Sequence, residues 1–208
     1  MAYRPTEATR RSAEAKREAI FSAARGIIAD SGFSGATVAA IAEGSGVSVG
    51  SVYSYFDNRE TLLAEVFREA AQYEFNQVRR AVDQVGDDPG KQLGTLIDVF
   101  ADRALRGRRL AWSLLFEPLI PAVEAERLTL RQSYRDLGEQ IIARGVAQGA
   151  FVDQDAPVVA SALMGAISEA LVGALDPGTT LLPHADPTEL VATIRRFCFL
   201  ALGATSPA

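Results

Sequence analysis

The chain offers few of the side chains that perform covalent or acid–base chemistry. Its only histidine, His184, lies in a loop-like stretch of proline and aspartate, and its only cysteine, Cys198, lies in an apolar segment that predicts a core position. A catalytic nucleophile needs a neighbouring base. The sequence shows no such pairing, no phosphate-binding glycine loop and no paired metal ligands. We therefore expect no enzymatic activity, no cofactor and no metal site.

Hydrogen bonding to phosphate is the chemistry that the stretch VSVGSVYSYF, residues 47–56, could perform. Hydroxyl groups and backbone amides at the start of a helix can donate to phosphate oxygens, and tyrosine hydroxyls can reach them from the wall of a groove. The very small residues would let such a helix enter the DNA major groove closely. Taken alone, a short helix of serine, glycine and tyrosine is more often a surface turn.

Three short helices are expected to hold this stretch in place. Apolar residues recur at helical spacing over residues 12–29, and Thr37 and Ser48 can cap the starts of helices over 38–43 and 48–55. Small residues between the last two helices permit a tight turn, as in a helix-turn-helix. The positions expected to face the core are Val38, Ile41, Ala42, Val47, Val52 and Phe56. The positions left facing outward are Val49, Gly50, Ser51, Ser54 and Tyr55, with Tyr53 at the edge.

The rest of the chain also predicts helices rather than strands. Amphipathic or apolar segments, separated by glycine and proline breaks, are expected over residues 59–82, 92–105, 109–116, 122–148, 157–175 and 187–202. No convincing strand pattern is present in the sequence. The expected fold class is therefore all-α, with about nine helices.

Composition and charge limit the class of protein. Of the 208 residues, 48% are hydrophobic, which is enough for a substantial core, and the net charge is −5. Residues 1–17 hold five Lys/Arg and two Asp/Glu, whereas residues 61–208 hold 14 Lys/Arg and 19 Asp/Glu. The N-terminal part is thus the least repelled by phosphate. Without an unbroken apolar run of roughly 18 residues or a signal-peptide pattern, and with one cysteine, we expect a cytoplasmic protein with no membrane span.

Residues 19–67 resemble the TetR family of one-component transcriptional regulators. The resemblance rests on an ordered set of motifs, which are SGF at 31–33, Thr37, GVS.GS.Y.YF at 46–56 and NRE.LL..VF at 58–67. It implies a three-helix DNA-binding domain over residues 1–58, followed by a larger helical domain over residues 59–208 that binds ligand and dimerises. The implied partners are double-stranded DNA, a small-molecule effector and a second copy of the chain.

The resemblance also implies roles for single residues. Thr37 would contact phosphate at the start of the second helix. Arg59 would do so at the start of the fourth helix, where family members usually have lysine. The recognition surface would consist of Ser48, Gly50, Ser51, Tyr53 and Tyr55.

Two positions depart from the family pattern. Val49 stands where many members have a basic or polar residue, and Ser54 stands where many have an aromatic residue or histidine. Val49 could meet a thymine methyl group, but hydrogen-bond readout of the bases would be thin. Specificity would then depend on DNA shape and on Arg10 and Arg11 in a minor groove. Tyr53 has an alternative role as a packing residue at the edge of the helix pair.

The middle of the chain is rich in aromatic residues and arginines. The aromatic residues expected to line an apolar ligand cavity, or otherwise to fill the core, are Phe67, Phe100, Trp112, Phe116 and Tyr134. Arg127, Arg131 and Arg135 share one helix face, where like charges repel unless an acid or an anion answers them. They either bind an anionic effector, or they pair with nearby acids or form a solvated face, and we favour the second explanation. The candidate acids are Glu124, Glu126, Asp136 and Glu139.

The last two long segments are apolar on nearly all sides, and a chain of this size cannot easily bury both alone. Pairing of two copies into a four-helix interface is the natural solution, and the family resemblance implies the same pairing. The expected interface residues are Ala162, Gly165, Ala166, Ala170, Gly173, Ile194 and Phe197. Such pairing would place two recognition helices about one DNA turn apart on a near-palindromic operator.

The expected function is that of a ligand-responsive transcriptional regulator, a repressor by the habit of the family. Ligand in the second domain would favour a conformation whose recognition helices are wrongly spaced for two successive major grooves. The alternative is a helical adaptor that binds a protein partner through its apolar C-terminal helices. A stable dimer with no other partner would favour the regulator.

Overall fold

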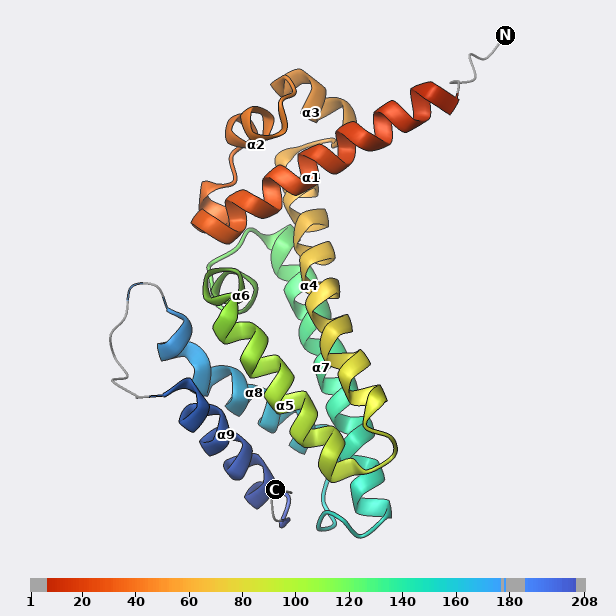
Figure 1. Cartoon of the computed structure of the whole chain (residues 1–208), viewed down its shortest axis with the longest axis vertical. Helices are drawn as coiled ribbons and strands as arrows, with labels where there is room; N and C mark the ends of the chain where they lie inside the picture. The colour runs from red at the N-terminus through yellow and green to blue at the C-terminus, as the bar shows by residue number, and fades with distance from the viewer. Residues whose placement is uncertain (1–6, 177, 179–185, 205–208) are drawn as a thin grey trace.

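The computed structural model describes residues 7–176, 178 and 186–204, and these form nine α-helices without a strand. The all-α prediction is confirmed for this part of the chain. Figure 1 shows an elongated molecule, with a small group of helices at one end and a longer helical bundle over the rest of its length. His184, which the sequence assigns to a surface loop, lies outside the described residues.

Three helices form the small group, namely α1 (Glu7–Gly35), α2 (Val38–Ser45) and α3 (Val49–Tyr55). They enclose a core in which the rings of Phe21 and Phe56 meet edge to face, with centroids 5.4 Å apart. The start of α1 projects beyond its neighbours (Figure 1). This helix begins earlier than the pattern over residues 12–29 predicts, because its first turns carry few apolar residues and so show no periodicity.

Side-chain caps and one glycine define the turn between α2 and α3. Thr37 Oγ1 accepts a hydrogen bond from the Ala40 amide at 3.1 Å, and Ser48 Oγ accepts one from the Ser51 amide at the same distance. Gly46 adopts a left-handed conformation, with φ of 68°, that ends α2. Only glycine takes this conformation without steric cost, so the turn depends on its backbone freedom.

Six helices form the bundle, namely α4 (Arg59–Gln84), α5 (Pro89–Arg106), α6 (Arg108–Leu115), α7 (Pro121–Ala147), α8 (Ala156–Leu175) and α9 (Pro187–Ala201). α7 packs against both α4 and α8, α5 packs against α4, and α9 lies on α5 (Figure 1). α1 rests on α6 and on the start of α4. The long helix α4 therefore belongs to both parts of the molecule.

The last two helices leave much of their apolar surface uncovered. α8 is long and apolar enough, by length and composition, to cross a membrane. Only 28% of its apolar stretch is buried within the chain. Large apolar side chains on α8 and α9 are exposed, namely Val158, Phe197 and Leu200. Such a surface needs a further partner to cover it.

The residues expected at a dimer interface differ in their exposure. Ala162, Gly165 and Phe197 are exposed, whereas the half-buried ones are Ala166, Ala170 and Gly173. Ile194 corrects the expectation, because its side chain is buried inside the chain and cannot reach a partner. The sequence did not indicate this burial. Ile194 lies three residues before exposed Phe197, and because α9 is apolar on several sides, spacing alone does not show which of the two faces the core.

Candidate DNA interface and ligand cavity

The serines of α3 stabilise a helix of only seven residues. Ser48 and Ser51 share a hydrogen bond between their hydroxyls at 3.0 Å, and Ser54 Oγ donates to the Ser51 carbonyl at 2.6 Å. A hydroxyl has one proton to donate, so Ser54 has none left for a phosphate in this rotamer. Thr37 is different, because it caps α2 as an acceptor and keeps its proton available.

The exposed face of α3 is formed by Val49 and Tyr53, whose exposed fractions are 43% and 49%, and by Gly50 and Ser54. Tyr55 is half-buried and packs against the core. The sequence predicted the opposite order for the two tyrosines. Successive residues of a helix are rotated by about 100°, so Tyr55 lies near the core side of Val52, while Tyr53 follows Val49 on the outside. Strict helical spacing from Val52 would have shown this.

Arg59, which is expected to contact phosphate, is directed toward the end of α1. Its Nε donates to the Ala36 carbonyl and its Nη2 to the Phe33 carbonyl, each at 3.2 Å. Carbonyls at the end of a helix lack intrahelical partners, and a guanidinium can satisfy two of them at once. The half-buried Arg59 thus ties the end of α1 to the start of α4.

The basic residues near the start of α1 differ in how they are engaged. Arg11 pairs with Glu7 at 3.3 Å, and Arg17 pairs with Glu65 while lying 4.7 Å from the ring centroid of Phe21. The exposed cations of α1 without an ion-pair partner among the described residues are Arg10 and Lys16. Arg10 and Arg11 sit on a rigid helix, so the structure does not present them as an extended arm.

Glu117, in the connection between α6 and α7, joins the bundle to the end of α1. Its carboxylate is only 8% exposed and accepts hydrogen bonds from the Phe33 and Ser34 amides, each at 3.1 Å. Gly32 turns the chain there with φ of 75°, and a Cβ at this position would lie 2.7 Å from both Glu117 oxygens. Sequence reasoning missed Glu117, since no spacing pattern connects it to a glycine 85 positions earlier.

Arg127 supports the same connection from within the bundle. Its side chain is 6% exposed and donates to the backbone carbonyls of Leu114 at 3.0 Å and Ser113 at 3.3 Å, and also to that of Glu117. Its remaining partner is the Glu124 carboxylate, 3.0 Å away. Burial lowers the pKa of Arg127, Glu124 opposes that shift, and the charge of Arg131 adds to it. One arginine of the α7 face is thus structural.

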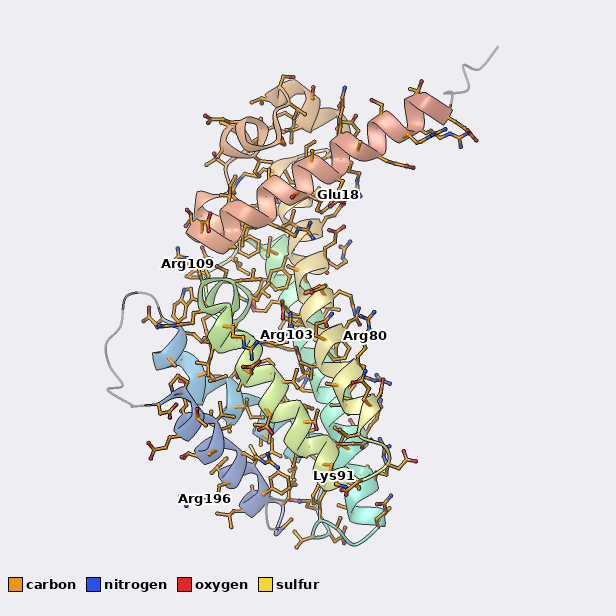
Figure 2. All side chains as sticks on the ribbon, viewed as in Figure 1. Glu18, Arg80, Lys91, Arg103, Arg109 and Arg196 are labelled. Carbon is orange, nitrogen blue, oxygen red and sulfur yellow. The ribbon has the colours of Figure 1, made fainter. Side chains whose placement is uncertain are left out.

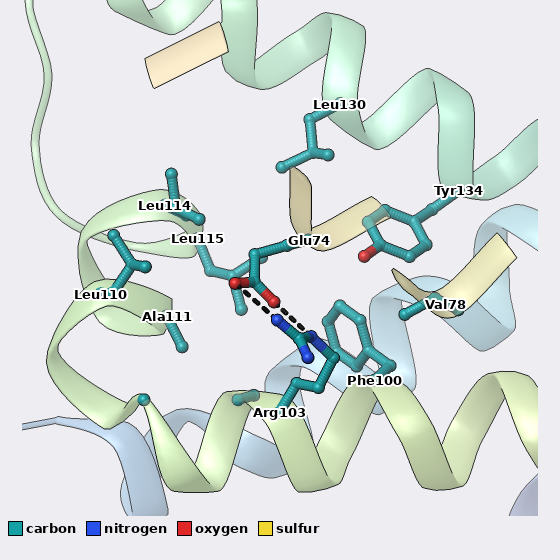
Figure 3. Close-up of a pocket in the computed structure, with 12 residues that line it drawn as sticks. Glu74, Val78, Phe100, Arg103, Leu110, Ala111, Leu114, Leu115, Leu130 and Tyr134 are labelled. Carbon is teal, nitrogen blue, oxygen red and sulfur yellow. Dashed lines mark hydrogen bonds and ion pairs between the residues drawn. The ribbon is translucent and has the colours of Figure 1, made fainter. Parts of the chain in front are cut away.

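A first cavity of about 60 Å³ lies among α4, α5, α6 and α7. Leucine side chains form much of its wall, and Glu74 and Arg103 meet there in a two-point ion pair with distances of 2.6 and 3.0 Å (Figure 3). The hydrogen bond to Glu74 is the main cause that raises the pKa of Arg103. The lining residues are Glu74, Val78, Phe100, Arg103, Ala104, Gly107, Leu110, Ala111, Leu114, Leu115, Leu130 and Tyr134.

The hydroxyl of Tyr134 points into this cavity (Figure 3). Tyr134 is 6% exposed, its ring packs edge to face on Phe75 and Phe100, and its hydroxyl makes no hydrogen bond to any described residue. Burial raises its pKa above the ordinary value, and the nearby Glu74 charge acts in the same direction. Tyr134 therefore presents a neutral hydrogen-bond donor to the cavity.

A second cavity of about 170 Å³ adjoins the first, because the two share Phe100, Leu115, Leu130 and Tyr134 as lining residues. Its other walls come from α7 and α8. The remaining lining residues are Arg127, Arg131, Arg135, Ser161, Met164, Gly165 and Ser168. No acidic residue is among them, so this cavity is bordered by three positive charges.

Of the aromatic residues expected at a cavity, Phe100 and Tyr134 line both cavities. Phe67 instead packs on Phe33, with centroids 5.7 Å apart, in the core that joins α4 to α1. Trp112 and Phe116 pack on each other at 5.4 Å and line neither cavity. The sequence identified a neighbourhood rich in aromatic residues, but much of the wall is leucine, which composition alone does not single out.

The residues considered for other chemistry stand apart from these sites. Cys198 is fully buried, and burial raises the pKa of its thiol to about 11. Among the residues that the structure describes, no group of three His, Cys, Asp or Glu side chains is placed to hold a metal ion.

Comparisons with known proteins agree with this arrangement. Residues 20–66 match the model for bacterial regulatory proteins of the tetR family, and residues 86–171 match the tetracyclin repressor-like C-terminal domain. The HTH-type transcriptional regulator BetI of Stenotrophomonas maltophilia is 33% identical over 49% of this chain and 52% of its own length. The chain thus matches about half the length of that regulator.

Two further proteins extend the likeness along the chain. The HTH-type transcriptional repressor KstR2 of Mycolicibacterium smegmatis is 26% identical over 65% of this chain and 67% of its own length. The structure of the transcriptional regulator FadR from Bacillus subtilis, in complex with stearoyl-CoA, superposes with a TM-score of 0.69 and 20% identity over 87% of this chain and 96% of FadR. From the two family models, these regulators and the helical arrangement, we conclude that the chain belongs to the TetR family of transcriptional regulators.

Proposed function

We propose that the protein is a transcriptional repressor that leaves a near-palindromic operator when a small molecule enters its bundle. The DNA-binding part would span residues 1–58, and the ligand-binding and dimerisation part would span residues 59–208. The protein would act in the cytoplasm, without catalytic activity or a cofactor. The observation that carries this proposal is the series of hydrogen bonds from Arg127, which lines the second cavity, through Glu117 to the end of α1.

The exposed face of α3 suits a major groove. Val49, Gly50 and Ser54 give it a low profile, and Tyr53 stands at its border as the one large polar group. Thr37 Oγ1 keeps a proton for a phosphate at the start of α2. Contacts of this kind position a protein on DNA, while base readout on this face is limited to the apolar side chain of Val49 and a thymine methyl group.

The exposed apolar side chains of α8 and α9 favour a homodimer. Val158, Phe197 and Leu200 would be covered by the same surface of a second copy, which is the usual geometry of a two-fold interface. A dimer also supplies the second recognition helix that a palindromic operator requires. The alternative, an adaptor for another protein, would leave the exposed face of α3 without a purpose.

The cavities supply a place for the effector. The second cavity, at about 170 Å³, is comparable to the engineered cavity of about 150 Å³ that binds benzene. The first cavity, at about 60 Å³, must widen before it admits more than a small group. The FadR structure with stearoyl-CoA shows that this fold can hold an apolar chain attached to an anionic group. A ligand that widens the first cavity would move α4 and so both recognition helices.

The direct test is binding of the full-length protein to a fluorescent DNA fragment from the promoter beside its own gene. We expect a sequence-specific complex whose affinity falls steeply with salt, because bound phosphates release counterions. Tyr53→Ala should weaken the complex. The matched control is Tyr73→Ala, which removes an exposed tyrosine from α4 (59% exposed, against 49% for Tyr53) and should leave DNA binding unchanged.

The outcomes separate the regulator from its alternative. Absence of any salt-sensitive, sequence-specific complex would refute DNA regulation, and equal losses in the two tyrosine variants would remove α3 from the interface. A protein that binds no DNA but captures one protein partner through α8 and α9 would favour the adaptor.

A further inference from the structure

The strongest unexplained feature of the bundle is the positive border of the second cavity. Arg127, Arg131 and Arg135 follow one another along α7 and line the cavity together. The sequence left two explanations for these charges, which were an anionic ligand on the one hand and neighbouring acids or a solvated face on the other. The structure allows the two explanations to be compared residue by residue.

Acidic side chains satisfy only Arg127. Glu124 pairs with Arg127 at 3.0 Å, but Glu126 pairs with Arg68 at 2.6 Å, and Asp136 accepts from Gln132. No ion pair joins Glu139 to an arginine of this face among the described residues. Pairing with these acids therefore accounts for Arg127 alone, and for Arg131 and Arg135 the two explanations are a solvated face and an anion.

The two remaining arginines are available to a ligand. Arg131 is exposed and makes no hydrogen bond or ion pair with any described residue. Arg135 is exposed and donates only to the neutral side chain of Gln132. A planar guanidinium presents several donors at once and so suits a carboxylate or a phosphate. Both groups line the same cavity, one helical turn apart on α7.

The same cavity has an apolar interior. Phe100, Leu115 and Leu130 form walls that the second cavity shares with the first, and Met164 closes it from α8. The volume of about 170 Å³ is enough for one aromatic ring, by comparison with the engineered cavity of about 150 Å³ that binds benzene. The unpaired hydroxyl of Tyr134 lies deeper, where it can donate to an oxygen on the ligand.

We infer that the effector is an amphipathic acid, with an apolar body inside the bundle and a carboxylate or phosphate held by Arg131 and Arg135. This inference rests on the proposed function, because it assigns the chemical class of ligand to the cavity of a ligand-responsive regulator. It excludes cationic effectors, since the positive border would repel them.

Matched probes that differ only in the head group provide the test. Calorimetric titration of the dimeric protein would compare 4-phenylbutanoate, 4-phenylbutyl phosphate, 4-phenyl-1-butanol and 4-phenylbutylamine. We expect at least one of the two acids to bind about tenfold more tightly than the alcohol, and the amine to bind most weakly. The stronger acid identifies the preferred head group.

Charge-removing variants locate the effect. Arg131→Gln with Arg135→Gln should abolish the preference for the acid over the alcohol while leaving the affinity for the alcohol unchanged. Arg80→Gln is the matched control, because Arg80 is exposed on α4, lines neither cavity and projects away from the bundle (Figure 2). It should keep the full preference. Both target arginines are exposed, so the variants should fold, and a melting curve would confirm it.

Several results would overturn the inference. These are equal affinity for acid and alcohol in the native protein, equal loss of preference in the Arg80 variant, and no binding of any probe. Promoter binding, measured without any probe, tests the proposed function separately. If the protein binds promoter DNA but shows no preference for acids, only the inference of an anion site is refuted. If it prefers acids but binds no DNA, only the proposed regulatory function is refuted.

Discussion

Glu117 holds the end of α1 through Phe33, whose backbone amide donates to Glu117 Oε2 at 3.1 Å. The Ser34 amide donates to the other carboxylate oxygen at the same distance. Phe33 precedes Thr37, the cap of α2, by four residues, so the contact lies next to the helix-turn-helix. On the bundle side, Arg127 donates to the Glu117 carbonyl and lines the second cavity. The second cavity is therefore linked to the end of α1 in two steps, because the Arg127 side chain bonds the Glu117 carbonyl and the Glu117 carboxylate bonds the Phe33 and Ser34 amides.

Glu117→Gln should loosen this connection. An amide side chain keeps one acceptor oxygen, so one of the two bonds is lost, at a cost of about 1–3 kcal/mol for a bond to a charged group. We expect a melting temperature lower by several degrees. Hydrogen exchange at Phe33 and Ser34 should become faster. Glu14→Gln, at an exposed position of α1, is the control, and unchanged exchange at both amides would contradict the role of Glu117.

Gly32→Ala should destabilise the same junction by a different route. The added Cβ would lie 2.7 Å from both Glu117 oxygens, and φ of 75° is strained for any side chain. We expect a loss of about 1–3 kcal/mol in unfolding free energy. The cost should be smaller in a Glu117→Ala background, because the clash disappears while the backbone strain stays. Denaturant titrations would measure the unfolding free energy of the native protein, the two single variants and the double variant. If the two losses simply add, the clash with Glu117 is relieved elsewhere.

Tyr53 and Tyr55 should contribute unequally to DNA binding. Tyr53→Phe removes an exposed hydroxyl and should weaken the complex by about fivefold, the value of one hydrogen bond, on every operator sequence tested. Tyr55→Phe alters a half-buried residue on the core side and should change affinity less than twofold. Fluorescence anisotropy with several operator variants measures both. A larger loss of affinity for Tyr55→Phe than for Tyr53→Phe would indicate that the opposite face of α3 enters the groove.

Phe197→Glu should convert the dimer to a monomer. The side chain is 56% exposed within one chain, and a charge there would be desolvated on pairing. Light scattering after size-exclusion chromatography would report the mass. Leu128→Glu, at an exposed apolar position of α7, is the control and should remain dimeric. A Phe197 variant that keeps the native mass would exclude this part of α9 from the interface.

Stability should fall at high pH because of Cys198. Burial raises the pKa of its thiol from 9.0 to about 11, so the folded protein resists ionisation that the unfolded chain allows. The stabilisation is complete below pH 9 and is lost as the pH rises toward 11, by about 2–3 kcal/mol for two pKa units. Denaturant titrations from pH 8 to 11 would measure this slope. Cys198→Ala should flatten it, and an identical slope in the variant would assign the effect to other groups.

Sequence patterns were informative wherever a local rule applied. Thr37 and Ser48 cap their helices as their side-chain chemistry predicts, and Val52 and Phe56 anchor α3 in the core. These features depend on residues within four positions of each other, so spacing alone determines them. The family motifs extend the same logic, because an ordered series of local signals is harder to meet by chance than any one of them.

Contacts between distant segments could not be obtained in this way. Arg59 was expected at phosphate but donates to carbonyls 23 and 26 positions earlier, and Ile194 was expected at an interface but lies inside the chain. Leucines rather than Phe67 or Trp112 form much of the first cavity wall. Each outcome depends on which helix faces which, and that choice is made by the packing of whole helices.

The sequence by itself determined the all-α class, the helix-turn-helix and its caps, because these follow from periodicity and from hydrogen bonds between near neighbours. Only the tertiary structure decided which charges meet partners within the chain. Arg127, Arg131 and Arg135 look alike along α7, yet the first is buried among carbonyls while the others are exposed at the border of the second cavity. The physical reason is that burial and long-range pairing are properties of packed helices, which a linear order of residues does not contain.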